Sequence, residues 1–92
     1  MSFNYSFSNL FENNLSIIYK KDKLLYESVF KKINEIISRD EITIDFYKNL
    51  RYDLKEYKRV HVLKSFVIIF KVFKKEKFIL FERVDHHDNV YK

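Results

Sequence analysis

Cysteine, glycine and proline are all absent from this 92-residue chain. The lack of cysteine excludes disulfide bonds, thiolate nucleophiles and cysteine-bound zinc, and it fits a reducing cytoplasm. Without glycine or proline, each turn must use residues such as Asn, Asp, Ser or Lys, so turns leave a weak signal. No apolar run approaches the ~20 residues that span a membrane, and the N-terminus does not resemble a signal peptide. We therefore expect a cytoplasmic protein without a membrane segment.

The residues that are present are typical of a folded domain with an anionic partner. The sequence is 47% hydrophobic and 18% aromatic, which predicts a core, and its length predicts one domain over residues 1–92. Residues 1–47 carry six Lys or Arg and seven Asp or Glu, whereas residues 48–92 carry twelve and six. A cationic second half indicates a polyanion such as nucleic acid, although a solvated lysine-rich surface has the same composition.

Hydrophobic periodicity predicts a strand and two helices in the first half of the chain. Residues 3–7 alternate between aromatic and polar side chains, as in a strand with one buried face. Ser8 or Asn9 would cap the first helix and Asp22 the second. The link between the two helices is short, which predicts an antiparallel hairpin. The apolar stripes of the two helices are Phe11, Leu15, Ile18 and Tyr19, and Leu25, Tyr26, Val29, Phe30, Ile33, Ile36 and Ile37.

Residues 38–57 are expected to connect these helices to the second half. Ile42, Ile44 and Phe46 alternate with polar residues, which is a weak strand pattern in a short acidic stretch. Residues 47–57 fit either one helical turn or an irregular loop.

Three closely spaced strands are predicted at residues 59–63, 66–73 and 78–83, with the second between the other two. The fold class is therefore α+β: an N-terminal strand, an antiparallel helical hairpin, and a three-stranded antiparallel meander that completes a small sheet. With both helices on one face of the sheet, the other face would present Arg59, His61 and Lys71 to a partner.

Acid–base side chains gather in the last strand and the tail, FILFERVDHHDNVYK. A short segment held by a rigid sheet is a common place for a functional site. The same residues have structural interpretations, because Arg83 could simply pair with Asp85 or Asp88 and the histidines could be solvated. His61 and His87 without a third ligand are too few for a metal site, so we predict neither metal nor cofactor. The residues concerned in the tail are Glu82, Arg83, Asp85, His86, His87, Asp88 and Tyr91.

The order of elements, with the segments RYDLKEYKRVHVLKSFVIIFKV and FERVDHHDNVY, resembles the RelE/ParE toxin superfamily. The most similar branch is the RelE-like and YafQ-like messenger-RNA interferases, and the match covers residues 48–91 in detail and residues 1–47 in element order. The resemblance implies a RelE-like microbial RNase fold and a cytoplasmic toxin of a type II toxin–antitoxin system. It further implies a metal-independent endoribonuclease that cleaves messenger RNA on the ribosome, and a RelB-like antitoxin bound in a heterotetramer or higher complex.

The resemblance also implies roles for particular residues. His87 and Tyr91 match the family's final histidine and aromatic residue, and Arg83 matches the arginine before them. His61 and Arg59 match the histidine and a basic position at the start of a strand. The implied catalytic group is His61, Arg83, His87 and Tyr91, and the implied RNA-binding group is Lys48, Lys55, Arg59 and Lys71.

Physical chemistry supports these roles. Attack of a ribose 2′-hydroxyl on the adjacent phosphate, which leaves a 2′,3′-cyclic phosphate, needs a base, an acid for the leaving 5′-oxygen, and cations for the phosphorane. Histidine can fill either proton-transfer role near neutral pH, arginine suits phosphate oxygens, and Tyr91 can stack on a base. Which group is the base stays open, because Lys48 stands where YafQ-like chains have a histidine, and Lys48 or Lys55 could supply a cation.

Two other functions remain open at the level of sequence. A ParE-like toxin of the same fold would act on DNA gyrase through protein contacts and would lack the RNase residues. A non-catalytic RNA-binding or partner-binding module would need only the basic surface. The ending that contains His87 favours the ribonuclease.

Overall fold

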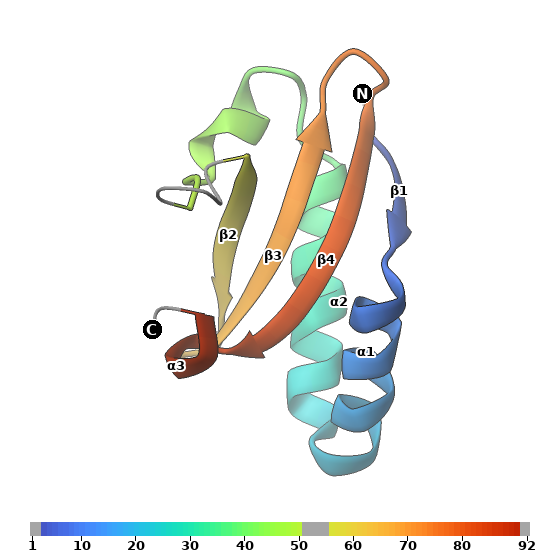
Figure 1. Ribbon diagram of the computed structural model, residues 1–92, viewed down its shortest axis with the longest axis vertical. Coiled ribbons are helices and arrows are strands. Elements are labelled where there is room, and N and C mark those ends of the chain that lie inside the picture. Colours follow the sequence, from blue (N-terminus) through green and yellow to red (C-terminus); the bar gives the residue numbers. More distant parts are fainter. Residues whose placement is uncertain (1–2, 51–55, 91–92) are drawn as a thin grey trace.

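A computed structural model describes residues 3–50 and 56–90 of the chain (Figure 1). The order of elements confirms the predicted α+β class, with a strand, a helical hairpin and a meander in sequence. The elements are β1 (Asn4–Phe7), α1 (Asn9–Lys21), α2 (Lys23–Ile37), the 3-10 helix η1 (Thr43–Phe46), β2 (Tyr57–Val62), β3 (Phe66–Phe73), β4 (Phe78–His86) and the short helix α3 (His87–Val90).

The four strands form one mixed sheet in the order β1-β4-β3-β2. β1 runs parallel to β4, whereas β2, β3 and β4 form the predicted antiparallel meander with β3 in the middle. α1 packs against β4, α2 packs against β2, and α2 passes behind the sheet in Figure 1. Within residues 3–50 and 56–90, no helix is long and apolar enough to cross a membrane.

The main core lies between the helices and one face of the sheet. Most of the predicted helical stripes are buried there, but Tyr19 is 48% exposed, so its assignment to the buried stripe was wrong. Burial of large apolar and aromatic side chains is the principal stabilising term for so small a domain. The fully buried side chains of this core are Phe11, Phe70, Phe81, Leu25, Ile33, Ile36, Ile44, Ile68, Ile79 and Val29.

Both helices begin at side-chain caps. The Phe11 amide donates to Ser8 Oγ (3.0 Å), so Ser8, rather than Asn9, is the cap of α1. Asp22 ends α1 and begins α2, because its amide donates to the Ile18 carbonyl and its carboxylate accepts from the Leu25 amide. A single residue thus serves both helices and explains the tight antiparallel hairpin.

The connector contains a 3-10 helix instead of the weakly predicted strand at Ile42–Phe46. The Asp40 carboxylate accepts hydrogen bonds from the amides of Ile42 (3.0 Å) and Thr43 (2.7 Å) and from the Thr43 hydroxyl (2.9 Å). These bonds start a turn and outweigh the short alternation. Ile44 is buried, whereas Ile42 and Phe46 are exposed. Part of the predicted loop at 47–57, namely residues 51–55, lies outside the described residues.

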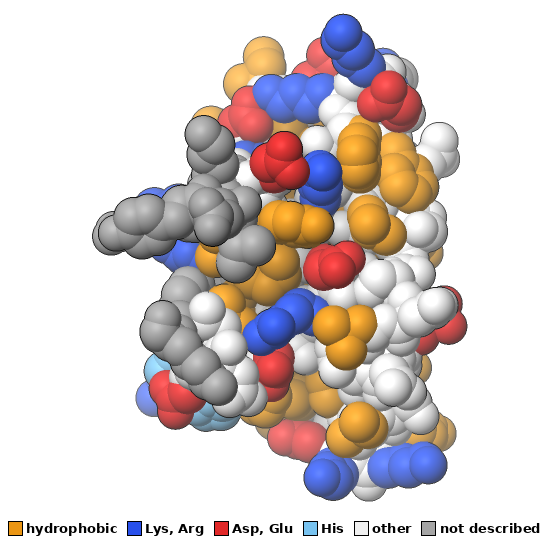
Figure 2. All heavy atoms as spheres, in the orientation of Figure 1, with side chains coloured by type: hydrophobic (Ala, Val, Ile, Leu, Met, Phe, Trp, Pro, Cys, Tyr) orange, Lys and Arg blue, Asp and Glu red, His pale blue; other side chains and the backbone are white. Residues whose placement is uncertain are grey.

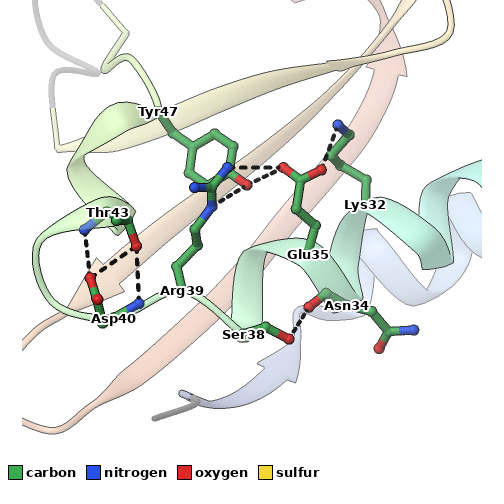
Figure 3. A network of polar contacts seen from close by, with 8 residues as sticks. All are labelled: Lys32, Asn34, Glu35, Ser38, Arg39, Asp40, Thr43 and Tyr47. Carbon is green, nitrogen blue, oxygen red and sulfur yellow. Dashed lines mark hydrogen bonds and ion pairs between the residues drawn. The ribbon is translucent and has the colours of Figure 1, made fainter.

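Polar groups fasten this connector to the end of α2 (Figure 3). The Tyr47 hydroxyl donates to the Glu35 carboxylate and accepts from Arg39 Nε (3.1 Å). Glu35 also pairs with Lys32 (3.1 Å) and with Arg39 (3.5 Å). Tyr47 is only 8% exposed, so its hydroxyl depends on these partners.

Buried Lys58 joins the connector to the start of β2. Its ammonium donates to the Tyr47 carbonyl (3.1 Å) and to Asn49 Oδ1 (2.9 Å), and it lies 3.4 Å from an Asp45 carboxylate oxygen. Asp45 also pairs with Lys74. Because these groups compensate the buried charge, Lys58 fixes the connector beside the sheet.

Candidate active site

The candidate site lies on the sheet face that points away from α1 and α2, here called the open face. Arg59 pairs with Ile69, and Ile69 pairs with Arg83, so the two arginines lie in one row across three strands. The Arg59 amide donates to the Lys48 carbonyl (2.9 Å), which places Lys48 beside the same row. With strands about 4.8 Å apart, Arg59 and Arg83 are anchored about 10 Å from each other, so their long side chains can approach one phosphate.

A β-bulge decides on which face Arg83 lies. Ile69 pairs with Arg83 and Phe70 pairs with Phe81, which leaves Glu82 as the extra residue in β4. Ile79 and Phe81 face the helices, so strict alternation would send Arg83 into the core. The bulge reverses the alternation, and therefore Val84 is buried while Arg83 lies on the open face.

Two residues at the start of α1 hold this bulge. The Ser8 hydroxyl donates to the Glu82 carbonyl (2.5 Å), and Asn14 Oδ1 accepts from the Val84 amide (3.1 Å). The Ser8 amide also donates to the Phe81 carbonyl (2.9 Å). Sequence reasoning identified Ser8 only as a helix cap, and no local pattern revealed its second role.

Arg83 lines a pocket of about 380 Å³ on the open face. Its guanidinium donates weakly to Asp85 (3.4 Å) and to the Asn89 carbonyl (3.3 Å), while its enclosed Nε has no partner among the described residues. An enclosed donor without an acceptor costs free energy, and an incoming anion would supply acceptors to this guanidinium. The other lining residues are Leu10, Leu50, Tyr57, Ile69, Glu82, Asn89 and Val90.

The open face is less exposed than the sequence suggested. Val67 and Ile69 are buried there beneath Leu50 and against the partly buried Tyr57 and Val90. Charges on this face are interspersed with apolar side chains in Figure 2 and do not form one basic field. The pocket therefore combines apolar side chains with the guanidinium of Arg83 and the carboxylate of Glu82.

Tyr57 is a candidate binding residue that the sequence reasoning missed. It lines the pocket beside Arg83, and the Lys71 ammonium lies 5.7 Å from the centre of its ring. Lys71 itself faces this side, as predicted, and pairs with Glu56 (3.2 Å). The sequence could have indicated Tyr57, because positions 57, 59 and 61 of a strand point to the same face. It was missed because the predicted strand began at residue 59, whereas β2 begins at Tyr57.

The histidines lie at the end of the sheet where β2 finishes and β4 turns into α3 (Figure 1). His61 pairs with Val67, which pairs with Asp85, so His61 is one row beyond the arginines. It also borders a hollow of about 390 Å³ at the edge of β2, shared with Lys31 and Lys32. His61 thus lies in the row next to that of the arginines and at the edge of the sheet, and it does not line the Arg83 pocket.

His87 follows directly after β4, as predicted, although β4 reaches His86 instead of ending at residue 83. The His87 amide donates to the Ser65 carbonyl (2.7 Å), and its ring stacks on His86 with centroids 4.8 Å apart. Asp88 lies within 3.5 Å of His86 Nδ1 and within 3.3 Å of His87 Nδ1. The predicted site residues Tyr91 and Lys55 lie outside the described residues.

Comparison with known proteins establishes the family. Over 78 residues the chain is 42% identical to a candidate toxin, RelE4, of Methanocaldococcus jannaschii, and the alignment covers 85% of this chain and 79% of that protein. The chain belongs to the RelE-like toxin superfamily. No family model matches it.

Solved structures of this superfamily share the fold. The RelBE2 toxin–antitoxin complex of Mycobacterium tuberculosis contains a chain that superposes with a TM-score of 0.73 at 16% identity, with 94% of this chain and 92% of that chain covered. The DinJ-YafQ toxin–antitoxin complex of E. coli gives a TM-score of 0.66 at 19% identity and full coverage of both chains. At such identities the likeness concerns the fold, and the RelE-like fold predicted from the sequence is confirmed.

Proposed function

We propose that this RelE-like chain is the toxin of a type II toxin–antitoxin pair and cleaves messenger RNA on the ribosome. The observation that carries the proposal is the row formed by Lys48, Arg59 and Arg83 beside a pocket of about 380 Å³. Three cations in one row suit a bent RNA backbone, and Tyr57 in the pocket offers a ring for a base. Histidines at the adjacent end of the sheet provide proton transfer.

The chemistry proposed for this site is an intramolecular transesterification, in which the neighbouring 2′-oxygen replaces the 5′-oxygen on phosphorus. The 2′-oxygen forms a bond to phosphorus as it loses its proton to a base, and the 5′-oxygen leaves with a proton from an acid. A 2′,3′-cyclic phosphate and a 5′-hydroxyl result. His87 takes one proton-transfer role and His61 the other, while Arg83 and Arg59 bind the equatorial oxygens of the phosphorane.

The antitoxin proposed for this chain is RelB-like, in a heterotetramer or larger complex. The RelBE2 and DinJ-YafQ structures are toxin–antitoxin complexes, which supports the same kind of partner here. Leu10 and Ile17 of α1 are about half exposed and lie seven residues apart on one helix. Such a pair suits the apolar side of an amphipathic helix. Co-expression should give a stable complex, and abundant harmless expression of this chain alone would count against a toxin.

The test of the proposed activity is cleavage of messenger RNA by the purified chain on programmed ribosomes. His87→Ala and Arg83→Ala should each lower the cleavage rate by about 10²-fold or more, since positioned acid–base and charge-stabilising groups contribute this much. Circular dichroism and thermal unfolding should show that both variants fold, because neither residue belongs to the main core.

Two comparisons make the test specific. His87→Ala should lose at least tenfold more activity than His86→Ala. The opposite result would mean that His86, and not His87, matches the family's final histidine. If only Lys48→Ala or Lys55→Ala abolishes cleavage, the proton transfers belong to lysine. Inhibition of DNA gyrase without RNA cleavage would refute the ribonuclease and favour a ParE-like action.

A further inference from the structure

The tail brings together two imidazoles and a carboxylate that no proposed step uses as a group. His86, His87 and Asp88 each offer a ligand atom, and these atoms lie within 4.8 Å of one another. Successive residues of a strand point to opposite faces, so neighbouring histidines normally diverge. Here β4 ends at His86 and α3 begins at His87, and the change of backbone brings the rings into a stack with an interplanar angle of 23°.

The backbone of this triad is anchored on several sides. The His86 amide donates to Asp85 Oδ1 (2.8 Å), and the His87 amide donates to the Ser65 carbonyl (2.7 Å). The His86 ring also meets Phe66 edge to face, with centroids 5.6 Å apart. Anchoring of this kind reduces the conformational entropy that a ligand would have to remove on binding.

The polar atoms of the triad face one another. The Asp88 amide donates to His86 Nδ1 (3.2 Å), and a metal ion bound at this nitrogen would replace that hydrogen bond. The two Asp88 oxygens are directed to different histidines, Oδ2 to His86 (3.5 Å) and Oδ1 to His87 (3.3 Å). The imidazoles are about 40% exposed and the carboxylate 73%, so an ion can reach all three.

We propose that His86, His87 and Asp88 bind one divalent transition metal of the zinc class, and that the bound metal withdraws His87 from proton transfer. Imidazole nitrogens with one carboxylate oxygen suit Zn²⁺, Ni²⁺ or Cu²⁺, whereas Mg²⁺ prefers oxygen ligands. With bonds of about 2.1 Å, tetrahedral ligands lie about 3.4 Å apart. The ligand atoms lie within 4.8 Å of one another, so they must approach by up to about 1.4 Å, which rotation of the exposed side chains out of the ring stack allows. The second half of this proposal rests on the proposed ribonuclease, and it makes the metal an inhibitor.

Metal binding is tested without RNA. Isothermal titration of the full chain with Zn²⁺ should give one site per chain, and excess Mg²⁺ should not compete. His86→Ala and Asp88→Ala should each weaken binding at least tenfold, as loss of a ligand does. His61→Ala and Glu76→Gln, which change an imidazole and an exposed carboxylate elsewhere, should bind Zn²⁺ as the parent chain does.

Nuclear magnetic resonance of the imidazoles tests directly whether His87 binds the ion. Zn²⁺ should shift the ring signals of His86 and His87 and leave those of His61 in place. Absence of binding, equal binding by His86→Ala, or loss of binding in His61→Ala would each overturn the metal site.

The inhibitory half is read as the ratio of cleavage rates with and without Zn²⁺ in the same variant. Zn²⁺ should slow cleavage by the parent chain at least tenfold, whereas Asp88→Ala should cleave at nearly the same rate with and without Zn²⁺. Binding without inhibition would refute the regulatory half alone. A parent chain that never cleaves RNA would refute the proposed function, while titration and imidazole signals would still decide the metal site.

Discussion

Replacing Tyr47 by phenylalanine removes one hydroxyl from the polar network between the connector and α2 (Figure 3). That hydroxyl donates to the Glu35 carboxylate and accepts from Arg39 Nε. A hydrogen bond to a charged group contributes about 1.5–3 kcal/mol. Because the Glu35 side chain is 41% exposed and water can replace the hydroxyl, we expect a loss of about 1–2 kcal/mol. For a domain of this size the melting temperature should fall by roughly 4–16 °C.

The same substitution should change how stability depends on alkaline pH. Burial and the hydrogen bond to Glu35 raise the pKa of Tyr47 to about 12, from 10.0. A raised pKa in the folded state means that the stabilisation is complete below about pH 10 and is lost as the pH rises towards 12. Two pKa units correspond to about 2.7 kcal/mol, which is the most that the parent chain can lose through this group.

The assay is urea denaturation of the parent chain and Tyr47→Phe at several pH values between about 9 and 12. Lysines deprotonate in both proteins, so the informative quantity is the difference between their free energies of unfolding. That difference should shrink as the pH rises, because only the parent chain can ionise Tyr47. A difference that stays constant over this range would refute the role assigned to the hydroxyl.

Four further predictions concern the connector, the bulge, the RNA and the metal. Lys58→Met should cost about 3 kcal/mol in urea denaturation, because the Tyr47 carbonyl and Asn49 lose their donor, whereas exposed Lys75→Met should change stability by less than about 0.5 kcal/mol. Ser8→Ala should lower kcat about tenfold by releasing the bulge that positions Arg83, with KM little changed and Ser8→Thr restoring the rate; an equal loss in both variants would argue against the hydroxyl. If four cations contact phosphates, the logarithm of the RNA-binding constant should fall with the logarithm of the salt concentration with a slope of about −3, and an affinity that does not depend on salt would indicate a protein target. A chelator should leave cleavage intact or raise it, and loss of activity reversed by one metal would overturn the proposed mechanism.

The sequence predicted the elements of the fold better than their boundaries. The apolar run over 66–73, broken only by Lys71, and the helical spacing over 25–37 are long patterns, and the structure confirms the central strand and the buried helix face that they predict. The pattern at Ile42–Phe46 is only five residues long, and three hydrogen bonds to the Asp40 carboxylate were enough to turn it into a 3-10 helix. Tyr19 was assigned to the core by spacing alone, yet it pairs on the surface with Tyr26, with ring centroids 5.0 Å apart.

The position of Arg83 could not be predicted from local pattern, and the reason is physical. In FILFERV, alternation from Ile79 and Phe81 assigns Arg83 to the helix side, where a guanidinium would lack partners. One extra residue, Glu82, reverses the assignment, and the hydrogen bonds that fix it come from Ser8 and Asn14, more than 69 residues earlier in the chain. The resemblance to RelE-like toxins assigned Arg83 a role without revealing this support. The bulge lies beside the candidate site, and its hydrogen bonds to Ser8 and Asn14 make α1 part of the structure that positions Arg83. A substitution at the start of α1 should therefore displace Arg83 at a smaller loss of stability than is needed to unfold the domain.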